Sequence, residues 1–532
     1  MDKCKIATYF NTIKYLKFKQ ILYLLKNKIG IYSSIKSYYY DYSKIKIQKL
    51  KPFPLKRNIL IQTNKFLIFN FLNVQKKFLK KKVEFNYKKN GLLWTYNLNY
   101  FDFLVQKNIS YNLGVSLLFD FYNKNDKMKK HSYPISIRII NVIKFFSFHN
   151  KTNKVLLKKI FQELIHLVNN IEHHLRGNHV LENAISIYAG GVFFKNKKIK
   201  KIGFNLLKKE LKEQILDDGM HFERSPMYHL ILFERILDLF NIIKSYEKRD
   251  CDILVKYSKK MMSLALNWNK LKRVPMMQDS TYFNSNRLNE IFNYYKKIIG
   301  IKVDKSKFSK SGYRVLKNDK YQIFLNIGNI SPDYQPGHSH ADELNFEIYK
   351  NNYPIIVDTG ISTYEKTERR LFERSTVSHN CLSINNENSS EVWSSFRVGQ
   401  RAKVIIEDDK FNLVSGFHDG FYKKYNTFIY RKWKVDKNKI IITDSLDTSF
   451  KKIKYCFGRI HFNPEVNLRK LSSNLFLANN DIFIEFKSTN NKFEFLIEDY
   501  FHSKNFNNLL RGKLIKYPVF NKMIILIYDK KK

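Results

Sequence analysis

Histidine, asparagine, tyrosine and carboxylate side chains gather in three short stretches of this sequence. The first is Arg176-Gly177-Asn178-His179, which leads into the helix-like run LENAISIYAGGVFF. An amide donor beside an imidazole is suited to hold a carboxylate and to move a proton. Asn178 would serve equally well as the N-cap of that helix, and His179 as a hydrogen-bonded core residue. The pattern alone leaves both interpretations open.

The second stretch, residues 218–229, reads DGMHFERSPMYH and precedes a long helical pattern. Ser225 and Pro226 predict the start of that helix, because serine caps helix N-termini and proline suits the first turn. A helix start does not explain four chemically active side chains at the same place: Glu223, Arg224, Tyr228 and His229. A buried phenol among charged neighbours could donate or accept a proton there.

The third stretch is the most specific and combines PGHSHAD (336–342), VDTG (357–360) and SHN (378–380). His338 and His340 would point to the same face of an extended segment. Adding Asp358 and His379 gives imidazole and carboxylate ligands typical of a divalent metal site, for which zinc is the best match. The alternative is a surface turn that happens to carry histidines.

The elements that must position these residues change character near residue 310. Before it, apolar residues recur at helical spacing, and the pattern predicts helices over 201–216, 227–246, 251–268 and 287–299. After it, short β-rich runs such as YQIFLNI, FIYRKWKV, KIIITD, DIFIEF and KMIILIY are separated by polar turns. The order predicts an all-helical domain followed by an antiparallel β-sandwich.

Composition and net charge limit the class of protein and the kinds of binding partner. A chain of 532 residues with 44% hydrophobic residues can form two or three domains with real cores, which excludes a disordered protein. The net charge of +48 favours a polyanion partner: nucleic acid, acidic polysaccharide or anionic lipid. Ordinary surface lysines in a lysine-rich composition explain the charge equally well. Because no zinc-finger, RNA-recognition or helix-turn-helix signature is present, we do not expect nucleic-acid binding.

The N-terminal segment is basic: the first 60 residues hold 14 Lys and Arg against Asp2 and Asp41. It could lie on a membrane surface or an acidic partner, or form an exposed amphipathic entry helix. We find neither a signal-peptide pattern nor an apolar run long enough to span a membrane. Four scattered cysteines fit a reducing compartment. We therefore expect a cytoplasmic or membrane-peripheral protein, with the periplasm as the alternative.

In this order the three stretches resemble the heparinase II/III family of polysaccharide lyases and the related alginate and oligoalginate lyases. The resemblance rests on RGNHVLENA, DGMHFERSPMYHLILFERILDL and the run from PGHSHADELNFEIY to EVWSSFRVG. It implies an α+β multidomain fold, with an incomplete α/α toroid followed by an antiparallel β-sandwich. We assign residues 1–60 to a basic helical segment, 61–308 to the toroid and 309–532 to the β-sandwich domain.

The resemblance also implies β-elimination at a uronic acid residue of an acidic polysaccharide or oligosaccharide, giving a 4,5-unsaturated uronate. Asn178 would hold the uronate carboxylate, and His179 would assist it or act as base for one epimer. Tyr228 would protonate the leaving group and, in a syn elimination, would also be a candidate base. His338 is a second candidate base.

The remaining family positions are structural or contact positions. His340, Asp358 and His379 match residues that hold a metal, expected to be Zn²⁺, in a supporting role. Glu223, Arg224 and Arg374 match contacts to the substrate or to the catalytic residues. Two positions depart from the family pattern, Gly177 and Asn345, and both bear on substrate choice. The alternative function is an accessory, non-catalytic glycan-binding protein of surface-polysaccharide biosynthesis with the same fold.

Overall fold

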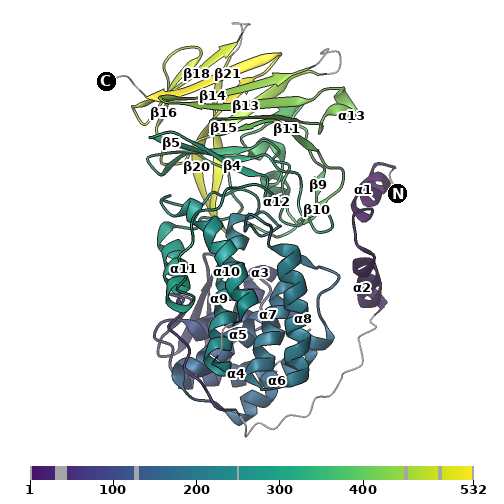
Figure 1. The fold of residues 1–532 in the computed structure, drawn as a ribbon, viewed down its shortest axis with the longest axis vertical. Helices are drawn as coiled ribbons and strands as arrows, with labels where there is room; N and C mark the ends of the chain where they lie inside the picture. The colour runs from purple at the N-terminus through teal and green to yellow at the C-terminus, as the bar shows by residue number, and fades with distance from the viewer. Residues whose placement is uncertain are drawn as a thin grey trace.

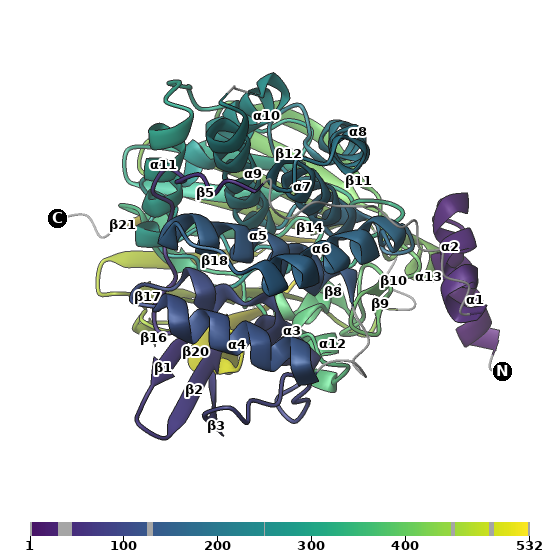
Figure 2. The same ribbon diagram turned by 90° about the horizontal axis from the view of Figure 1, so that it is seen from below.

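A computed structural model describes residues 3–29, 45–124, 131–248, 251–447, 453–488 and 494–529. Helices occupy one half of the molecule and β-sheets the other (Figure 1). Seen from below, the helices lie in front of the sheets, and the first two helices stand at one side (Figure 2). The predicted division between residues 308 and 309 lies in the segment between the last long helix and the first strand of the β half.

The helical half is built from helices that pack on one another, and α5, α7 and α9 are buried along most of their length. They are α3 (Leu92–Tyr100), α4 (Tyr111–Lys124), α5 (Ser132–His149), α6 (Lys154–Asn169), α7 (Gly177–Phe193), α8 (Lys197–Gln214), α9 (Pro226–Glu247), α10 (Asp252–Ala265) and α11 (Ser285–Ile298), with short 3₁₀ turns η2 (Asp102–Val105) and η3 (Leu266–Trp268). The four helices predicted from periodicity are α8 to α11. In α6, Leu156, Leu164 and Leu167 are fully buried, whereas Val155 in the first turn is exposed.

A three-stranded sheet precedes these helices, where an all-helical region was expected. Its strands are β1 (Leu60–Gln62), β2 (Phe66–Phe71) and β3 (Val74–Leu79), paired antiparallel in that order. In β2, Leu67, Phe69 and Phe71 alternate into the core. Leu72 and Asn73 both adopt positive φ, 55° and 62°, which is the geometry of a tight hairpin. In the sequence, FLIFNF is a short apolar run interrupted only by Asn70, and such a run cannot be told from a helical segment by periodicity alone.

The β half contains antiparallel sheets. A four-stranded sheet is formed by β4 (Tyr313–Lys317), β5 (Tyr321–Asn326), β6 (Phe346–Lys350) and β7 (Tyr353–Ile356). An eight-stranded sheet has the order β11 (Val404–Lys410), β12 (Leu413–His418), β13 (Ile429–Asp436), β14 (Lys439–Leu446), β21 (Lys522–Asp529), β18 (Ile482–Ser488), β17 (Leu475–Ala478) and β16 (Leu468–Lys470). These strands include the predicted β-rich runs, whose alternating apolar residues fill a shared core.

Further strands complete this half. A second four-stranded sheet has the order β19 (Leu496–Asn505), β20 (Asn508–Pro518), β15 (Cys456–His461) and β8 (Leu382–Ile384), and β9 (Val392–Trp393) pairs with β10 (Arg397–Val398). Short helical turns lie between strands: α12 (Glu368–Glu373), η4 (Thr376–Ser378) and α13 (Tyr422–Tyr425). Many of the site residues predicted in the third stretch lie in the loops beside these short elements.

A buried ion pair ties the eight-stranded sheet to those loops. Arg431 donates to Asp444 through Nε and Nη2, at 2.6 and 2.9 Å, and Tyr517 donates to the same carboxylate at 2.7 Å. Arg431 Nη1 donates to the carbonyl of Leu344 at 2.9 Å, beside the third stretch. The Arg431 and Asp444 side chains are almost fully excluded from solvent.

Asp444→Ala is expected to lower the free energy of unfolding by about 3–5 kcal/mol, because it leaves the Arg431 guanidinium buried without its counter-ion. Urea unfolding followed by fluorescence measures this. Asp409→Ala is the matched control: it removes the partner of Arg314 from an exposed pair, with an expected loss of about 0–1 kcal/mol. Equal losses for the two variants would contradict the expectation.

Two helices, α1 (Lys3–Ile13) and α2 (Phe18–Ile29), lie along one side of the molecule, beside the border between the helical and β halves (Figure 1). Both fall in the predicted basic segment. Within the described residues, no helix combines the length and the apolar character needed to cross a membrane.

Candidate active site

Asn178 is positioned by an unusual start of α7. Arg176 and Gly177 both have positive φ, 58° and 54°, before the helix turns regular. A Cβ on Gly177 would lie 2.2 Å from Oε1 of Glu223, so only glycine leaves room for that carboxylate. The Asn178 backbone N–H donates to the same Oε1 at 3.0 Å. The departure from the family pattern at Gly177 therefore goes with the close approach of Glu223.

The Asn178 side chain joins all three sequence stretches. Its Nδ2 donates to Oε2 of Glu223 at 3.0 Å and to Nε2 of His338 at 3.2 Å. Asn178 is inside α7 and does not cap it, so the N-cap interpretation does not hold. Glu223 orients the amide, and the amide points a donor toward the imidazole.

Asp279 fixes the tautomer of His338. The His338 Nδ1 lies 2.8 Å from Oδ2 of Asp279, and Arg370 donates to both oxygens of that carboxylate, at 2.5 and 2.7 Å. Burial alone would raise the pKa of Asp279, but Arg370 and the neighbouring imidazoles hold it well below its ordinary value. Because an ionised carboxylate only accepts, Nδ1 carries the proton and Nε2 carries the lone pair, which accepts from Asn178 until a substrate carboxylate takes that donor.

Tyr228, in the first turn of α9, lies against His338. Ser225 caps this helix by accepting from the Tyr228 N–H, and Pro226 occupies the first turn, as predicted. The Tyr228 ring stacks on the His338 ring with centroids 4.0 Å apart, and its hydroxyl lies 3.2 Å from that of Tyr364. Burial raises the pKa of Tyr228 above its ordinary value. The phenol therefore keeps its proton at neutral pH and can donate it.

His179 occupies a neighbouring position with different partners. Its Nδ1 lies 3.3 Å from Oε1 of Glu172, its ring packs on Tyr133, and its side chain is 31% exposed. Burial would lower the pKa of His179, but Glu172 beside it raises the value above its ordinary one. A partly exposed imidazole that favours its cation can neutralise a carboxylate.

The predicted contact residues Arg224 and Arg374 are buried. Arg224 donates to the backbone carbonyl of Asn329 and to the side chain of Asn326. Arg374 donates to the carbonyls of Ser339, Ser394 and Arg397. Arg224 thus fastens the helical half to the β half, whereas Arg374 joins loops within the β half. Contact with substrate stays a prediction for them, and the placement of Glu223 favours a positioning role for that residue as well.

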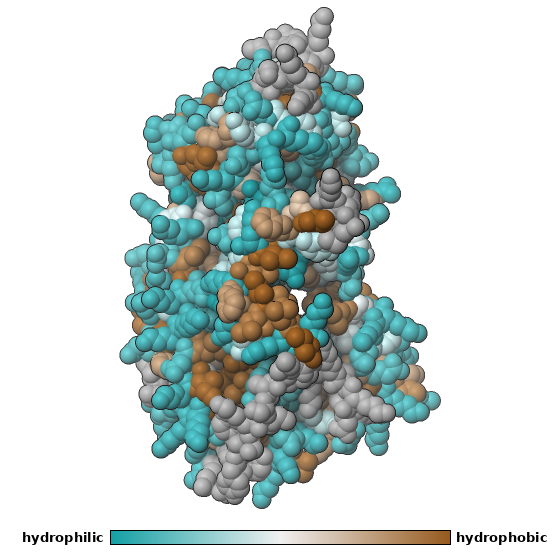
Figure 3. Space-filling view, turned by 90° about the vertical axis from the view of Figure 1, so that its right-hand side faces the viewer, coloured by the Kyte–Doolittle hydropathy of each residue, from teal (hydrophilic) through white to brown (hydrophobic). Residues whose placement is uncertain are grey.

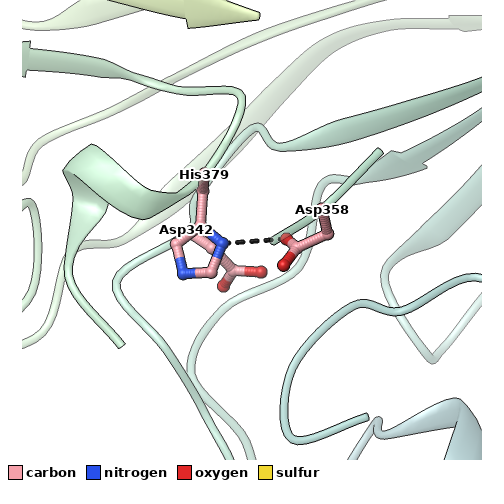
Figure 4. A group of neighbouring side chains, drawn as sticks. All are labelled: Asp342, Asp358 and His379. Atoms are coloured by element: carbon pink, nitrogen blue, oxygen red, sulfur yellow. Dashed lines mark hydrogen bonds and ion pairs between the residues drawn. The ribbon is translucent and has the colours of Figure 1, made fainter. Parts of the chain in front are cut away.

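The third stretch brings potential metal ligands together. Asp342, Asp358 and His379 each offer a ligand atom within 4.8 Å of the others, and all three are buried. They converge from three separate segments (Figure 4), and His379 Nδ1 lies 2.8 Å from Oδ2 of Asp358. Asn345 also donates to Oδ2 of Asp358, at 2.5 Å. The departure at Asn345 therefore lies against this cluster.

His340 approaches the cluster without being one of these three residues. Its Nε2 lies 2.8 Å from Oδ1 of Asp279, and its ring centroid is 5.2 Å from that of His379. Burial lowers the pKa of His340 to about 4, so its imidazole is neutral at neutral pH. Two buried imidazole nitrogens, Nδ1 of His340 and Nε2 of His379, have no hydrogen-bond partner among the described residues. Unpaired buried nitrogens beside two carboxylates fit a cation.

Two family models together match residues 68–513 of this chain. Residues 68–304 match the family described as "Heparinase II/III N-terminus", and residues 301–513 match "Heparinase II/III-like, C-terminal". The chain belongs to the heparinase II/III family. Its fold resembles a solved heparinase III structure with a TM-score of 0.65 at 17% identity, covering 85% of this chain and 81% of the other. A second heparinase III structure matches with a TM-score of 0.61 at 15% identity, covering 82% and 76%. The predicted class, an α/α toroid followed by an antiparallel β-sandwich, is confirmed.

The sequence relatives in the heparinase II/III family match this chain over only part of their own length. A heparin-sulfate lyase of Bacteroides stercoris is 26% identical over 267 residues, which are 42% of this chain and 38% of the relative. A heparin-sulfate lyase of Pedobacter heparinus is 24% identical over 245 residues, 40% of this chain and 37% of the relative. Each match therefore spans less than two fifths of the curated relative.

Several residues of this heparinase II/III site were not found from the sequence: Asp279, Asp342, Tyr364 and Arg370. Asp279 is 59 residues from His338 in the chain and stands alone in the run MMQDSTYF. Arg370 looks like one of several charged residues in a short helix, although it is fully buried. Asp342 ends the run PGHSHAD, and its position two residues after His340 was the one signal in the sequence that it could join the metal ligands.

Proposed function

We propose that this chain is a polysaccharide lyase that cleaves an acidic, uronate-containing polysaccharide by β-elimination. The observation that carries the proposal is the group formed by Asn178, His338 and Tyr228, in which an amide donor, an oriented imidazole and a protonated phenol meet. Family membership and the named activity of the sequence relatives support the same reaction class.

The first requirement is to make the C5 proton of a uronate acidic. The negative charge that develops on the carboxylate must be offset by preorganised donors or cations. Both hydrogens of Asn178 Nδ2 are shared in the structure, one with Glu223 and one with Nε2 of His338, so a bound uronate carboxylate would take the second hydrogen in place of His338. Glu172 raises the pKa of His179 and so favours the imidazolium that would offset the carboxylate charge.

The second requirement is to move two protons without water. The C5–H bond breaks and its proton goes to Nε2 of His338, whose lone pair is set by the Asp279 contact to Nδ1. The electron pair forms the C4–C5 double bond, the C4–O4 bond breaks, and Tyr228 gives its phenolic proton to O4. In a syn elimination Tyr228 would first have to lose its own proton; the phenolate would then take the C5 proton and pass that same proton to O4. The raised pKa of Tyr228 disfavours this route. The products together have the mass of the substrate.

We also propose that Asp358 and His379 hold a divalent cation, best matched by Zn²⁺, with Asp342 or His340 completing the set. Three buried ligand atoms within 4.8 Å and the two unpartnered imidazole nitrogens support this proposal. A bound cation would neutralise the buried carboxylates and hold together the loops that carry His338. The proton transfers described above use residues outside this cluster.

Zinc analysis of protein purified under metal-replete conditions tests this cluster. About one zinc per chain is expected, and His379→Ala should lose most of it because a ligand is removed. His418→Ala is the matched control, since His418 is equally buried on β12 and lies outside the cluster. Metal content that is unaffected by His379→Ala would overturn the assignment.

A panel of acidic glycans, monitored for an unsaturated product, tests the activity itself. Polyuronates and sulfated glycosaminoglycans are both included, because the geometry selects a uronate and not its sulfation. Appearance of the conjugated double bond with at least one glycan is the expected result. Tight binding across the panel with no product would favour the alternative, an accessory glycan-binding protein of surface-polysaccharide assembly.

A further inference from the structure

An apolar stripe follows the solvent side of α1 and α2. Its members recur at helical spacing and have exposed fractions of 39–80%: Ile6, Phe10, Ile13, Phe18, Leu22, Leu25 and Ile29. Figure 3 shows brown side chains gathered down the middle of that face. A contiguous apolar stripe of this kind on a protein surface marks an interaction site.

The opposite side of these helices is the one that contacts the protein. Thr12 accepts from Nε1 of Trp393 at 3.0 Å, and Gln20, fully buried, donates to the carbonyl of Tyr334 at 3.1 Å. Tyr9 packs edge-on against Trp393, and the Arg401 guanidinium lies 3.6 Å from the centre of the Tyr15 ring. The helices are thus anchored by polar and aromatic contacts, and the stripe is left facing outward.

The stripe has a basic surrounding. Residues 3–29 contain seven lysines and no acidic residue. Lys14, Lys26 and Lys28 are exposed beside the apolar side chains. The adjacent helix α8 adds further lysines. Lys209 of α8 lies close enough to Lys19 to lower the pKa of Lys19, together with burial and Arg176. Lys17 pairs with Glu213, which leaves the other exposed lysines to set the charge around the stripe. An apolar stripe flanked by exposed lysines is complementary to an anionic, partly apolar surface.

We propose that α1 and α2 dock this protein on the surface of a lipid bilayer that contains anionic headgroups. The helices are 11 and 12 residues long, whereas a membrane-spanning helix needs about 20, so they would lie in the interface. The apolar stripe would enter the acyl boundary while the lysines meet the headgroups. A second copy of the chain fits less well, because pairing two such faces would bring like charges together.

Flotation of the full chain with vesicles tests this proposal. Binding is expected with vesicles that contain phosphatidylglycerol and not with phosphatidylcholine alone. The variant Phe10→Ser, Phe18→Ser, Ile29→Ser should reduce the bound fraction by about tenfold or more, because it removes apolar area from the stripe. The control variant is Phe411→Ser, Leu471→Ser, Phe520→Ser, which changes exposed apolar residues in the β half and should bind like the unmodified protein.

Three results would overturn the proposal. The first is the absence of flotation with anionic vesicles. The second is equal flotation of the stripe variant and the unmodified protein. The third is self-association in sedimentation velocity that the stripe variant abolishes while vesicle binding persists, which would assign the stripe to a second copy. Thermal melts of each variant confirm that a loss of binding is not a loss of folding.

Discussion

Tyr228→Phe is expected to lower kcat on a cleavable uronate glycan by roughly 10²- to 10⁴-fold, the range that a general acid contributes. The phenol ring stacks on the ring of His338, with centroids 4.0 Å apart. Burial raises its pKa, so the proton is available for the leaving oxygen at neutral pH. Phenylalanine retains the stacked ring, and KM should therefore change far less than kcat.

Tyr364→Phe is the matched control for this loss. Its hydroxyl lies 3.2 Å from that of Tyr228, so the variant removes one hydrogen bond and leaves the proposed proton donor in place. A decrease of less than about tenfold is expected, in keeping with one neutral hydrogen bond. If Tyr228→Phe were no slower than Tyr364→Phe, the proposed role of Tyr228 would be wrong.

Asp279→Asn is expected to have the second large effect, a decrease in kcat of roughly 10³- to 10⁴-fold by analogy with other carboxylate–histidine pairs. Asparagine can donate to Nδ1 of His338, which would place the proton on Nε2 and remove the lone pair that accepts the C5 proton. Asp279 does not need to touch the substrate for this result. It is a positioning residue, and the loss should fall on kcat with the bound glycan retained.

Asp279→Asn also removes a charge from Arg370, so a stability loss must be separated from the catalytic one. Glu163→Gln provides that separation, because it breaks an equally buried pair with Arg138 within the helical half, away from the site. It should lower thermal stability similarly and leave kcat within about twofold. A similar drop in kcat for both variants would attribute the Asp279 effect to folding alone.

Much of the fold could be predicted from the sequence because local patterns determine it. Helices α8 to α11 and the long strands have clear apolar periods, and Ser225-Pro226 begins α9 as predicted. The β1–β3 sheet was missed because its strands are short and their sequences do not differ clearly from the helical segments that follow. Asn178 was open between helix cap and active-site residue. Its place inside α7 excludes the cap, and its contact with His338, 160 residues away, is the observation behind the proposed role.

The site was predictable in its residue types and not in its pairings. His338 and His340 were expected to share a face if their segment were extended. His338 lies in a turn and His340 in irregular chain, and both contact the same carboxylate, that of Asp279. Asp279 comes from the end of the helical half, and no local pattern indicates that it will meet two histidines of the β half. Long-range partners of this kind depend on packing of the two halves, which spacing along the chain does not encode.

Mass spectrometry of the products from the first glycan that is cleaved tests the central claim most directly. β-Elimination predicts fragments whose masses sum to that of the substrate, with a new ultraviolet absorbance, and no label incorporated when the reaction is run in heavy-oxygen water. Fragments that gain the mass of one water and carry the label would show hydrolysis. That result would contradict the proposed roles of Asn178, His338 and Tyr228.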